Sequence, residues 1–311
     1  MTEPEQMSAA GDVIGVIGAG QIGRSVAHAF AERSAVVLVD RDEGILAEAV
    51  DSIRRAHLGR LLHKVSSVRP ETILKNIEPT TELGALRAAN FLIENITESP
   101  GEKLDLHQML ARLADPEAVI ATNTSAIPLA YLASAHAGRA DRFLGLHFMI
   151  PVIEIRYLEL IRARETSPAA ISAVRGMLER HDLRAVEVAD GPGFVSNRLL
   201  MLLVNEAAAV VREGTAPAAS VDAVLQNCMG HRLGPLATAD LIGLDTVVRS
   251  LRVLQRFCDE MKFAPDPMLL ELVKAGQLGR KTGSGFFDYT AGPLKAERKS
   301  AHAEIEEAPA E

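Results

Sequence analysis

The sequence predicts an α/β fold in which a doubly wound, mainly parallel sheet is followed by an all-α domain. From about Gly11 to Asp190, short apolar and β-branched runs alternate with segments of helical periodicity. That alternation is typical of parallel strands joined by helices. After Gly191-Pro192-Gly193 the pattern is helical alone. The chain has 311 residues and is therefore long enough for two domains, each with its own core.

Apolar runs and helical periodicity place the elements along the chain. The expected strands are Val13 to Ile17, Ala35 to Val39, Phe91 to Ile93, Val119 to Ala121, Phe143 to Phe148 and Val186 to Val188. The expected helices are Arg24 to Glu32, a long polar segment that runs from Glu43 past His63 and projects from the sheet, and, in the second domain, Asn197 to Glu213, Val221 to Gln226, Thr238 to Phe263 and Pro267 to Ala275. We expect a sheet domain at 11–190, a helical domain at 191–289, a disordered N-terminus at 1–10 and a disordered acidic tail at 290–311.

The composition excludes several classes of protein. The formal net charge is −8 and no long basic stripe occurs, which argues against nucleic acid as a partner. Cys228 and Cys258 fit neither a zinc site nor a disulfide framework, so we expect a reducing, cytoplasmic compartment. Met1 to Ala10 does not resemble a signal peptide, and the most apolar helical stretch, Leu199 to Val211, is interrupted by polar residues. We therefore expect no membrane association.

A glycine-rich turn is the most informative motif. Gly18-Ala19-Gly20-Gln21-Ile22-Gly23 lies between the first expected strand and the first expected helix. Two glycines let the backbone turn and approach a pyrophosphate, the third lets helix and strand pack closely, and the helix N-terminus offers N–H groups to the anion. Asp40 ends the second strand, where a carboxylate binds the adenosine ribose. This combination predicts a Rossmann-type dinucleotide-binding domain. Asp40 favours NAD, although the adjacent Arg41 is a group that could receive the extra phosphate of NADP.

Polar side chains at the carboxyl ends of the strands are the candidates for chemistry, because ligands bind at that edge of a parallel sheet. They are Glu94, Asn123-Thr124-Ser125, His147 and, a little beyond the strand of His147, Glu159. Hydride transfer from an alcohol requires a base for the hydroxyl proton, and imidazole titrates near neutrality. His147 is the candidate base. Glu159 is the candidate carboxylate that would fix its tautomer and stabilise the imidazolium.

From Val13 to Tyr289 the chain resembles the L-3-hydroxyacyl-CoA dehydrogenases. The matching motifs, in order, are Gly18 to Gly23, Val36-Val37-Leu38-Val39-Asp40, Asn123-Thr124-Ser125, Gly145-Leu146-His147-Phe148, Glu159, Pro192-Gly193-Phe194-Val195-Ser196-Asn197-Arg198-Leu199-Leu200, Gly234-Pro235, Gly243-Leu244-Asp245 and Lys281-Thr282-Gly283-Ser284-Gly285-Phe286.

This resemblance implies a two-domain, usually dimeric enzyme that oxidises a 3-hydroxyacyl thioester reversibly with NAD and without a metal. The implied catalytic residues are the dyad His147 and Glu159, with Ser125 and Asn197 holding the substrate oxygen. The implied cofactor-binding residues are Gly18, Gly20, Gln21, Ile22, Gly23, Asp40, Arg41 and Asn123, with Glu94 and Lys103 on the nicotinamide side. The helical domain is then the substrate and dimerisation domain.

The chain departs from the family pattern around the substrate. The family motif His-Phe-Phe-Asn-Pro is here His147-Phe148-Met149-Ile150-Pro151, and Ala126 stands where a second serine is common. The lysine-rich helix that helps to seat coenzyme A is replaced by Gly59-Arg60-Leu61-Leu62-His63-Lys64. An alternative substrate is thus an acyl-carrier-protein thioester, such as the glyceryl unit oxidised in polyketide extender-unit biosynthesis. A second alternative is a non-catalytic dinucleotide-binding protein, as among crystallin-like relatives, although His147 and Glu159 are both present.

Overall fold

The computed structural model describes residues 11–290 as two compact units that divide between Phe194 and Val195. The predicted disordered N-terminus, 1–10, and the predicted disordered tail, 290–311, apart from its first residue, lie outside the described residues. Each unit is described by itself.

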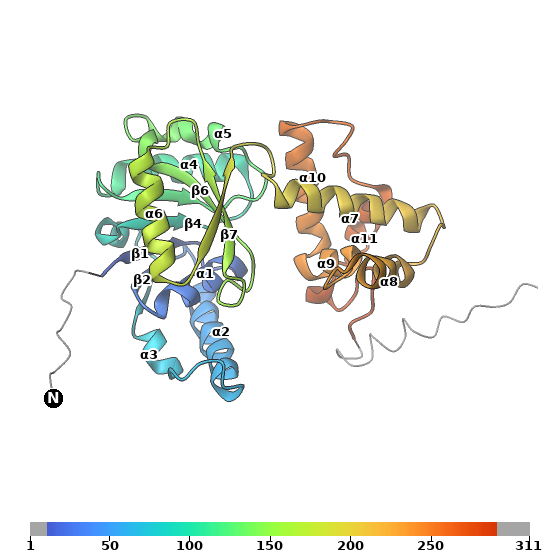
Figure 1. Cartoon of the computed structure of the whole chain (residues 1–311), viewed down its shortest axis with the longest axis horizontal. Coiled ribbons are helices and arrows are strands. Elements are labelled where there is room, and N and C mark those ends of the chain that lie inside the picture. The colour runs from blue at the N-terminus through green and yellow to red at the C-terminus, as the bar shows by residue number, and fades with distance from the viewer. Residues whose placement is uncertain (1–10, 291–311) are drawn as a thin grey trace, which may run out of the picture. The chain divides into compact units, whose positions relative to one another are not determined.

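The first unit is built on an eight-stranded sheet in the order β3-β2-β1-β4-β5-β6-β7-β8 (Figure 1). The strands are β1 Val13–Ile17, β2 Ala35–Val39, β3 Ile77–Thr80, β4 Phe91–Glu94, β5 Val119–Thr122, β6 Phe143–Phe148, β7 Tyr157–Arg162 and β8 Arg184–Ala189. Every neighbouring pair is parallel except β6 and β7, which are antiparallel. Because β2 and β4 flank β1, the chain changes direction beside β1, where open α/β sheets bind ligands. The predicted α/β fold is confirmed.

Helices join the strands of this unit. They are α1 Gln21–Ala31, α2 Glu43–Leu62, α3 Pro70–Leu74, α4 Pro100–Leu113, α5 Leu129–Ala133 and α6 Pro168–Arg180. The carboxylate of Asp42 starts α2 by accepting hydrogen bonds from the N–H groups of Gly44 and Ile45. The first half of α2 packs into the sheet core through Leu46, Ala49 and Ile53, and its second half extends away from the strands (Figure 1). The core is aliphatic around a few aromatic rings, among them the fully buried Phe30 and Phe143.

Two strands escaped prediction because their sequence patterns are weak. The edge strand β3 contains Pro79 and only its first residue, Ile77, is buried. The interior strand β7 contains Glu159 among apolar residues, so the carboxylate was expected in a connecting segment rather than inside a strand. Placing Glu159 beyond a strand end was wrong: Glu159 is the third residue of β7.

The second unit is helical. Its helices are α7 Ser196–Arg212, α8 Ala218–Met229, α9 Pro235–Ile242, α10 Leu244–Phe257 and α11 Pro267–Lys274. The single predicted helix from Thr238 to Phe263 was wrong, because Gly243 has a φ of +99° and separates α9 from α10. The buried carboxylate of Asp240 accepts hydrogen bonds from the N–H groups of Phe286 and Phe287 and from the Tyr289 hydroxyl. These bonds attach the end of the unit to α9.

Among residues 11–290, no helix combines the length and apolarity needed to cross a membrane.

Candidate active site

The glycine turn has the geometry that a pyrophosphate requires. Gly18 has a φ of +91°, and a Cβ there would lie 2.8 Å from the carbonyl oxygen of Asn95. A Cβ at Gly23 would lie 1.7 Å from the carbonyl oxygen of Gly18, so helix and turn meet backbone to backbone. A Cβ at Gly20, in contrast, would meet no atom within 4 Å. No side-chain cap bonds to the N-terminus of α1, which begins at Gln21, directly after Gly20. The turn therefore fits a dinucleotide phosphate.

Asp40 follows β2 at the same edge of the sheet. Its Oδ2 accepts a 2.8 Å hydrogen bond from the N–H of Ala19, so the carboxylate also holds the glycine turn. Its Oδ1 accepts a 3.2 Å bond from the N–H of Asp42. Arg41 is exposed beside it. Both groups are thus at the position from which a ribose hydroxyl or a ribose phosphate would be bound.

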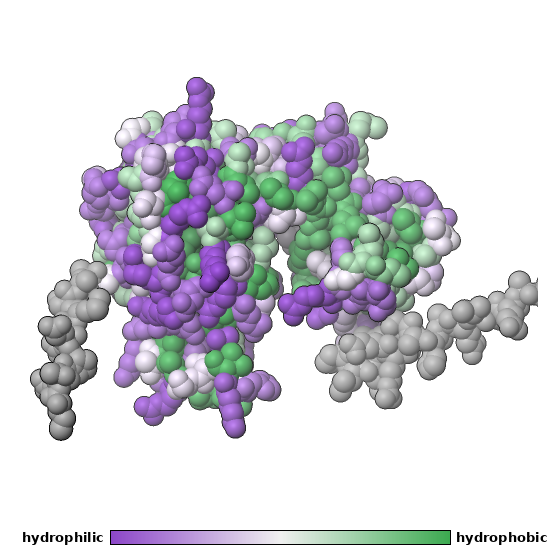
Figure 2. Space-filling model, in the orientation of Figure 1, coloured by the Kyte–Doolittle hydropathy of each residue, from purple (hydrophilic) through white to green (hydrophobic). Residues whose placement is uncertain are grey.

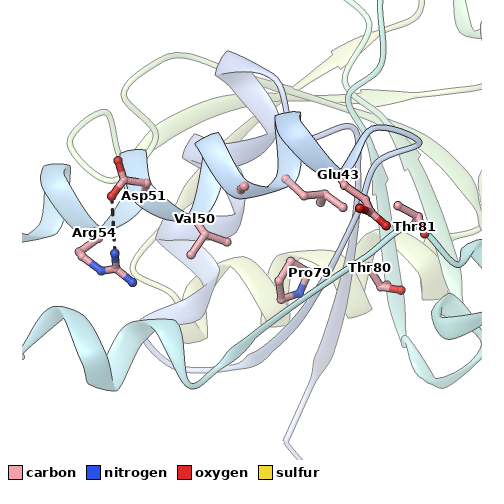
Figure 3. A pocket seen from close by; sticks show the side chains of 9 residues that line it. Glu43, Val50, Asp51, Arg54, Pro79, Thr80 and Thr81 are labelled. Atoms are coloured by element: carbon pink, nitrogen blue, oxygen red, sulfur yellow. Dashed lines mark ion pairs between the residues drawn. The ribbon is translucent and has the colours of Figure 1, made fainter.

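A hollow of about 630 Å³ lies between α2 and β3 (Figure 3). Glu43, Thr80 and Thr81 line one end and the ion pair of Asp51 with Arg54 lines the other. Apolar side chains lie between these polar ends, as Figure 3 shows for Val50 and Pro79. The Thr80 end adjoins Asp40, because the Asp40 N–H donates to the Thr80 carbonyl at 3.3 Å. No sequence motif marks these residues as a binding site.

The sheet register brings His147 and Glu159 together. The two residues are direct partners across the antiparallel pair β6 and β7, so their side chains lie on one face of the sheet. Nδ1 of His147 lies 2.8 Å from Oε2 of Glu159, and Nε2 lies 3.1 Å from Oγ of Ser125. Because an ionised carboxylate can only accept, Nδ1 carries the proton and Nε2 is left to face the serine hydroxyl. His147 and Glu159 are 7% and 8% exposed, so the pair is almost shielded from water.

Asn123 fixes the end of β6. Its Oδ1 accepts a 2.9 Å hydrogen bond from the N–H of Phe148, and its Nδ2 donates to Oδ1 of Asn95 at 2.8 Å. The ring of Phe194 packs 5.8 Å from that of His147, measured between ring centroids. Asn123 therefore anchors the backbone directly after His147, and the ring of Phe194 packs near the imidazole itself.

Glu94 and Lys103 form an ion pair in the interior. Both are fully buried, and Lys103 Nζ lies 2.6 Å from Oε1 of Glu94. Burial raises the pKa of the Glu94 carboxyl, but the Lys103 charge and the His107 hydrogen bond outweigh burial and lower that pKa to about 2. Burial lowers the pKa of Lys103. The negative charges of Glu94 and Glu98 raise that pKa by more than burial lowers it, so the net shift is upward. Thr122 and the N–H of Ile96 supply the remaining donors to Glu94.

Glu98 is a site residue that the sequence analysis missed. It lies in the loop after β4, four residues beyond Glu94, and its carboxylate binds the 124–126 turn directly. The available signal was its position, since a carboxylate in that loop stands at the same sheet edge as Ser125.

Asn197 belongs to the helical unit, where it is the second residue of α7. It is 8% exposed, and its Nδ2 has no hydrogen-bond partner among the described residues. A buried amide donor without a partner is a candidate for binding a ligand oxygen. Within residues 11–290 no group of three or more His, Cys, Asp or Glu side chains is arranged to hold a metal ion.

The glycine turn, the carboxylate of Asp40 and the imidazole–carboxylate pair together are typical of a nicotinamide-dependent dehydrogenase of the Rossmann type. Residues 13–191 match the family model described as "3-hydroxyacyl-CoA dehydrogenase, NAD binding domain", and residues 193–289 match "3-hydroxyacyl-CoA dehydrogenase, C-terminal domain". The chain belongs to the 3-hydroxyacyl-CoA dehydrogenase family, and its cofactor is NAD.

Similar proteins cover nearly the whole chain. A probable 3-hydroxybutyryl-CoA dehydrogenase of Deinococcus radiodurans is 38% identical over 276 residues, which are 88% of this chain and 99% of that protein. The crystal structure of FadB2 from Mycobacterium tuberculosis is 32% identical, with a TM-score of 0.84 over 91% of this chain and 100% of that one. The (S)-3-hydroxybutyryl-CoA dehydrogenase structure from Ralstonia eutropha is 34% identical, with a TM-score of 0.79 over 90% of this chain and 99% of that one.

Proposed function

We propose that this chain oxidises the hydroxyl group of a 3-hydroxyacyl-CoA, reversibly, to the 3-oxoacyl-CoA. The observation that carries the proposal is the contact of His147 with both Glu159 and Ser125. The strands β1, β4, β5 and β6 are parallel, so this contact and the glycine turn lie at the same edge of the sheet. The names of the similar proteins favour a short substrate such as 3-hydroxybutyryl-CoA.

In this reaction the Ser125 hydroxyl donates a hydrogen bond to the substrate oxygen and holds it beside His147. Nε2 of His147, the ring nitrogen that carries no proton and faces Ser125, takes the hydroxyl proton. The imidazolium that forms keeps its Nδ1 proton on Glu159, whose negative charge stabilises it. NAD, when bound at the glycine turn and Asp40, supplies the hydride acceptor. The amide of Asn197 is proposed as a second donor to the substrate oxygen.

The remaining cofactor contacts are also proposals. Gly18, Gly20, Gln21, Ile22 and Gly23 would bind the pyrophosphate. Asp40 and Arg41 would lie at the ribose. Because both oxygens of Glu94 are occupied by internal donors, Glu94 and Lys103 would contribute to the nicotinamide side through the loop that they support, and Asn123 through the end of β6.

The decisive test is a panel of thioesters mixed with purified protein and NAD or NADP, followed at the absorbance of the reduced nicotinamide. We expect 3-hydroxybutyryl-CoA with NAD to be turned over and NADP to be used at least tenfold less efficiently. Absence of turnover with every hydroxyacyl-CoA would contradict the proposal.

An acyl-carrier-protein thioester is a second candidate substrate, because each arginine of α2 contacts a carboxylate. Arg54 and Arg55 pair with Asp51, and Arg60 lies 3.9 Å from Glu32. These carboxylates compete with the phosphates of coenzyme A for the arginines of α2, with a single one, Asp51, shared by Arg54 and Arg55. In the panel above, glyceryl-carrier protein should then give a kcat/KM higher than that of any coenzyme A ester. A non-catalytic protein would turn over neither kind of thioester.

We also propose that the helical domain joins two copies of the chain. Hydrophobic atoms gather on its surface in Figure 2, and exposed apolar side chains follow α7, α8 and α9. They are Val195, Leu199, Val224, Met229 and Leu241. Single-chain proteins rarely expose a contiguous apolar surface of this kind. Light scattering should give the mass of a dimer at micromolar concentration.

The two cysteines are unpaired, which supports a reducing, cytoplasmic location.

A further inference from the structure

A single carboxylate oxygen organises the turn that carries Ser125. Oε1 of Glu98 accepts hydrogen bonds from Oγ1 of Thr124 at 2.5 Å, from the N–H of Ser125 at 3.0 Å and from the N–H of Ala126 at 2.8 Å. Oγ1 of Thr124 in turn accepts from the N–H of Ile127 at 3.1 Å. Three donors from consecutive residues thus converge on one atom, which restricts the backbone of the turn.

The other oxygen of Glu98 is held from the interior. Oε2 lies 3.6 Å from Nζ of the fully buried Lys103, which also bonds to Oε1 of Glu94 and to the carbonyl of Ile96. A buried ammonium group is stable only with partners in good geometry, so its position is tightly determined. Lys103 therefore fixes the carboxylate of Glu98 relative to α4 and the end of β4.

The Ser125 hydroxyl joins this arrangement to the reacting groups. The backbone N–H of Ser125 is bound to Glu98, while its Oγ lies 3.1 Å from Nε2 of His147. Ala126 takes part in this restraint only through its backbone N–H, which donates to Glu98, because its methyl side chain has no polar atom. The restraint is thus compatible with the loss of the second serine that is common in the family.

We propose that Glu98 is a positioning residue that holds the Ser125 hydroxyl against His147. It acts through Ser125, by fixing the backbone of the turn. The expected effect of Glu98 on kcat rests on the proposed function. The expected effect of Glu98 on the position of the Ser125 hydroxyl rests on the geometry alone.

The test is a double-mutant cycle of Glu98→Gln with Ser125→Ala. Glutamine retains an acceptor oxygen but loses the charge that binds Lys103 and three donors, so we expect kcat to fall about 10- to 100-fold, with the KM for NAD changed less than threefold. In the Ser125→Ala background the same change should lower kcat less than twofold, because the hydroxyl is already absent. Glu102→Gln is the matched control: Glu102 is exposed on α4, and its replacement should leave kcat unchanged. Effects of Glu98→Gln and Ser125→Ala that multiply would overturn the proposal.

A second measurement separates this proposal from the proposed reaction. In cofactor-free protein, the ¹⁵N chemical shift of Nε2 in His147 reports its contact with the serine hydroxyl. Glu98→Gln and Ser125→Ala should shift this resonance in the same direction, and Glu102→Gln should leave it in place. An unchanged resonance in Glu98→Gln would refute the positioning role even if no thioester were ever turned over. If Glu98→Gln does not fold, Glu98→Asp, which keeps the charge and withdraws it by one methylene, takes its place with the same expectations.

Discussion

The sheet domain contains two imidazole–carboxylate pairs that differ in what the second ring nitrogen meets. In one pair, His147 contacts Glu159 through Nδ1 and the Ser125 hydroxyl through Nε2. In the other, His107 contacts Glu94 through Nε2 at 3.2 Å and a further histidine, His136, through Nδ1 at 3.0 Å.

The second pair is closed. His107 and Glu94 are completely buried, and both nitrogens of the His107 ring are occupied inside the protein. Glu94 accepts from four donors, so its charge is used within the core. In the proposed mechanism, a histidine beside a carboxylate is therefore not sufficient for catalysis. The ring also needs a nitrogen that faces a hydroxyl at the ligand edge of the sheet, and only His147 of these two has one.

Replacing each of the two histidines by glutamine, in separate variants, should give the largest difference in kcat. His147→Gln removes the proposed base, and we expect kcat to fall about 10³- to 10⁴-fold. His107→Gln should retain at least a tenth of the parent kcat, because that ring touches no reacting atom. Both values come from the rate of NADH formation with 3-hydroxybutyryl-CoA. Equal turnover by His147→Gln and the parent protein would abolish the base role.

Lys103→Met tests the closed pair through stability. Removing the ammonium leaves the carboxylate of Glu94 buried beside an apolar side chain, which destabilises a protein by about 3–5 kcal/mol. Urea unfolding followed by circular dichroism measures the free energy of unfolding. Lys262→Met, which replaces an exposed lysine, is the control and should change that energy by less than about 0.5 kcal/mol. A similarly small change in the free energy of unfolding for Lys103→Met would show that burying the Glu94 carboxylate does not require the Lys103 ammonium group.

Glu159→Gln tests the open pair through activity. A neutral amide still contacts Nδ1 but no longer stabilises the imidazolium, so we expect kcat to fall about 10²-fold at pH 8. The unfolding free energy should change less than it does in Lys103→Met. A variant with full kcat would show that the carboxylate does not assist proton removal.

The smallest effect concerns pH and the buried histidines. Burial first, and then the charges of His107 and Arg139, lower the pKa of His136 from 6.5 to about 3. Burial and the charges of His57 and Arg60 lower the pKa of His28 to about 3 as well. Between pH 6.5 and pH 3 the unfolded chain binds protons that the folded chain does not, so stability decreases as the pH falls through this range.

For each such histidine the slope increases as the pH falls through 6.5 and approaches about 1.4 kcal/mol per pH unit below about pH 5.5. Urea unfolding at pH 7, 6 and 5 measures it. Replacing His136 by Gln should reduce the slope, whereas replacing the exposed His231 by Gln should leave it unchanged. A slope that is the same in all three proteins would contradict the lowered pKa of His136.

Local patterns made much of this molecule predictable. The glycine turn, its flanking strand and helix, and Asp40 lie within a short stretch whose backbone is dictated by glycine conformation and by apolar periodicity. Strands β1, β2 and β6 have the predicted bounds. Where local signals were weak or a single glycine interrupted the pattern, as at β3, β7 and Gly243, the prediction failed.

The sequence indicated the residue types at the site and the pairing of His147 with Glu159, but neither the strand register that produces this contact nor the contact of Glu98 with Ser125. His147 meets Glu159 because an antiparallel strand returns in one particular register, and Ser125 meets Glu98 because two neighbouring strands end side by side. Such pairings join positions that are distant along the chain, and their geometry is set by strand register and core packing. Neither can be deduced from the spacing of residues, since the free energy that selects the register is shared across the whole sheet.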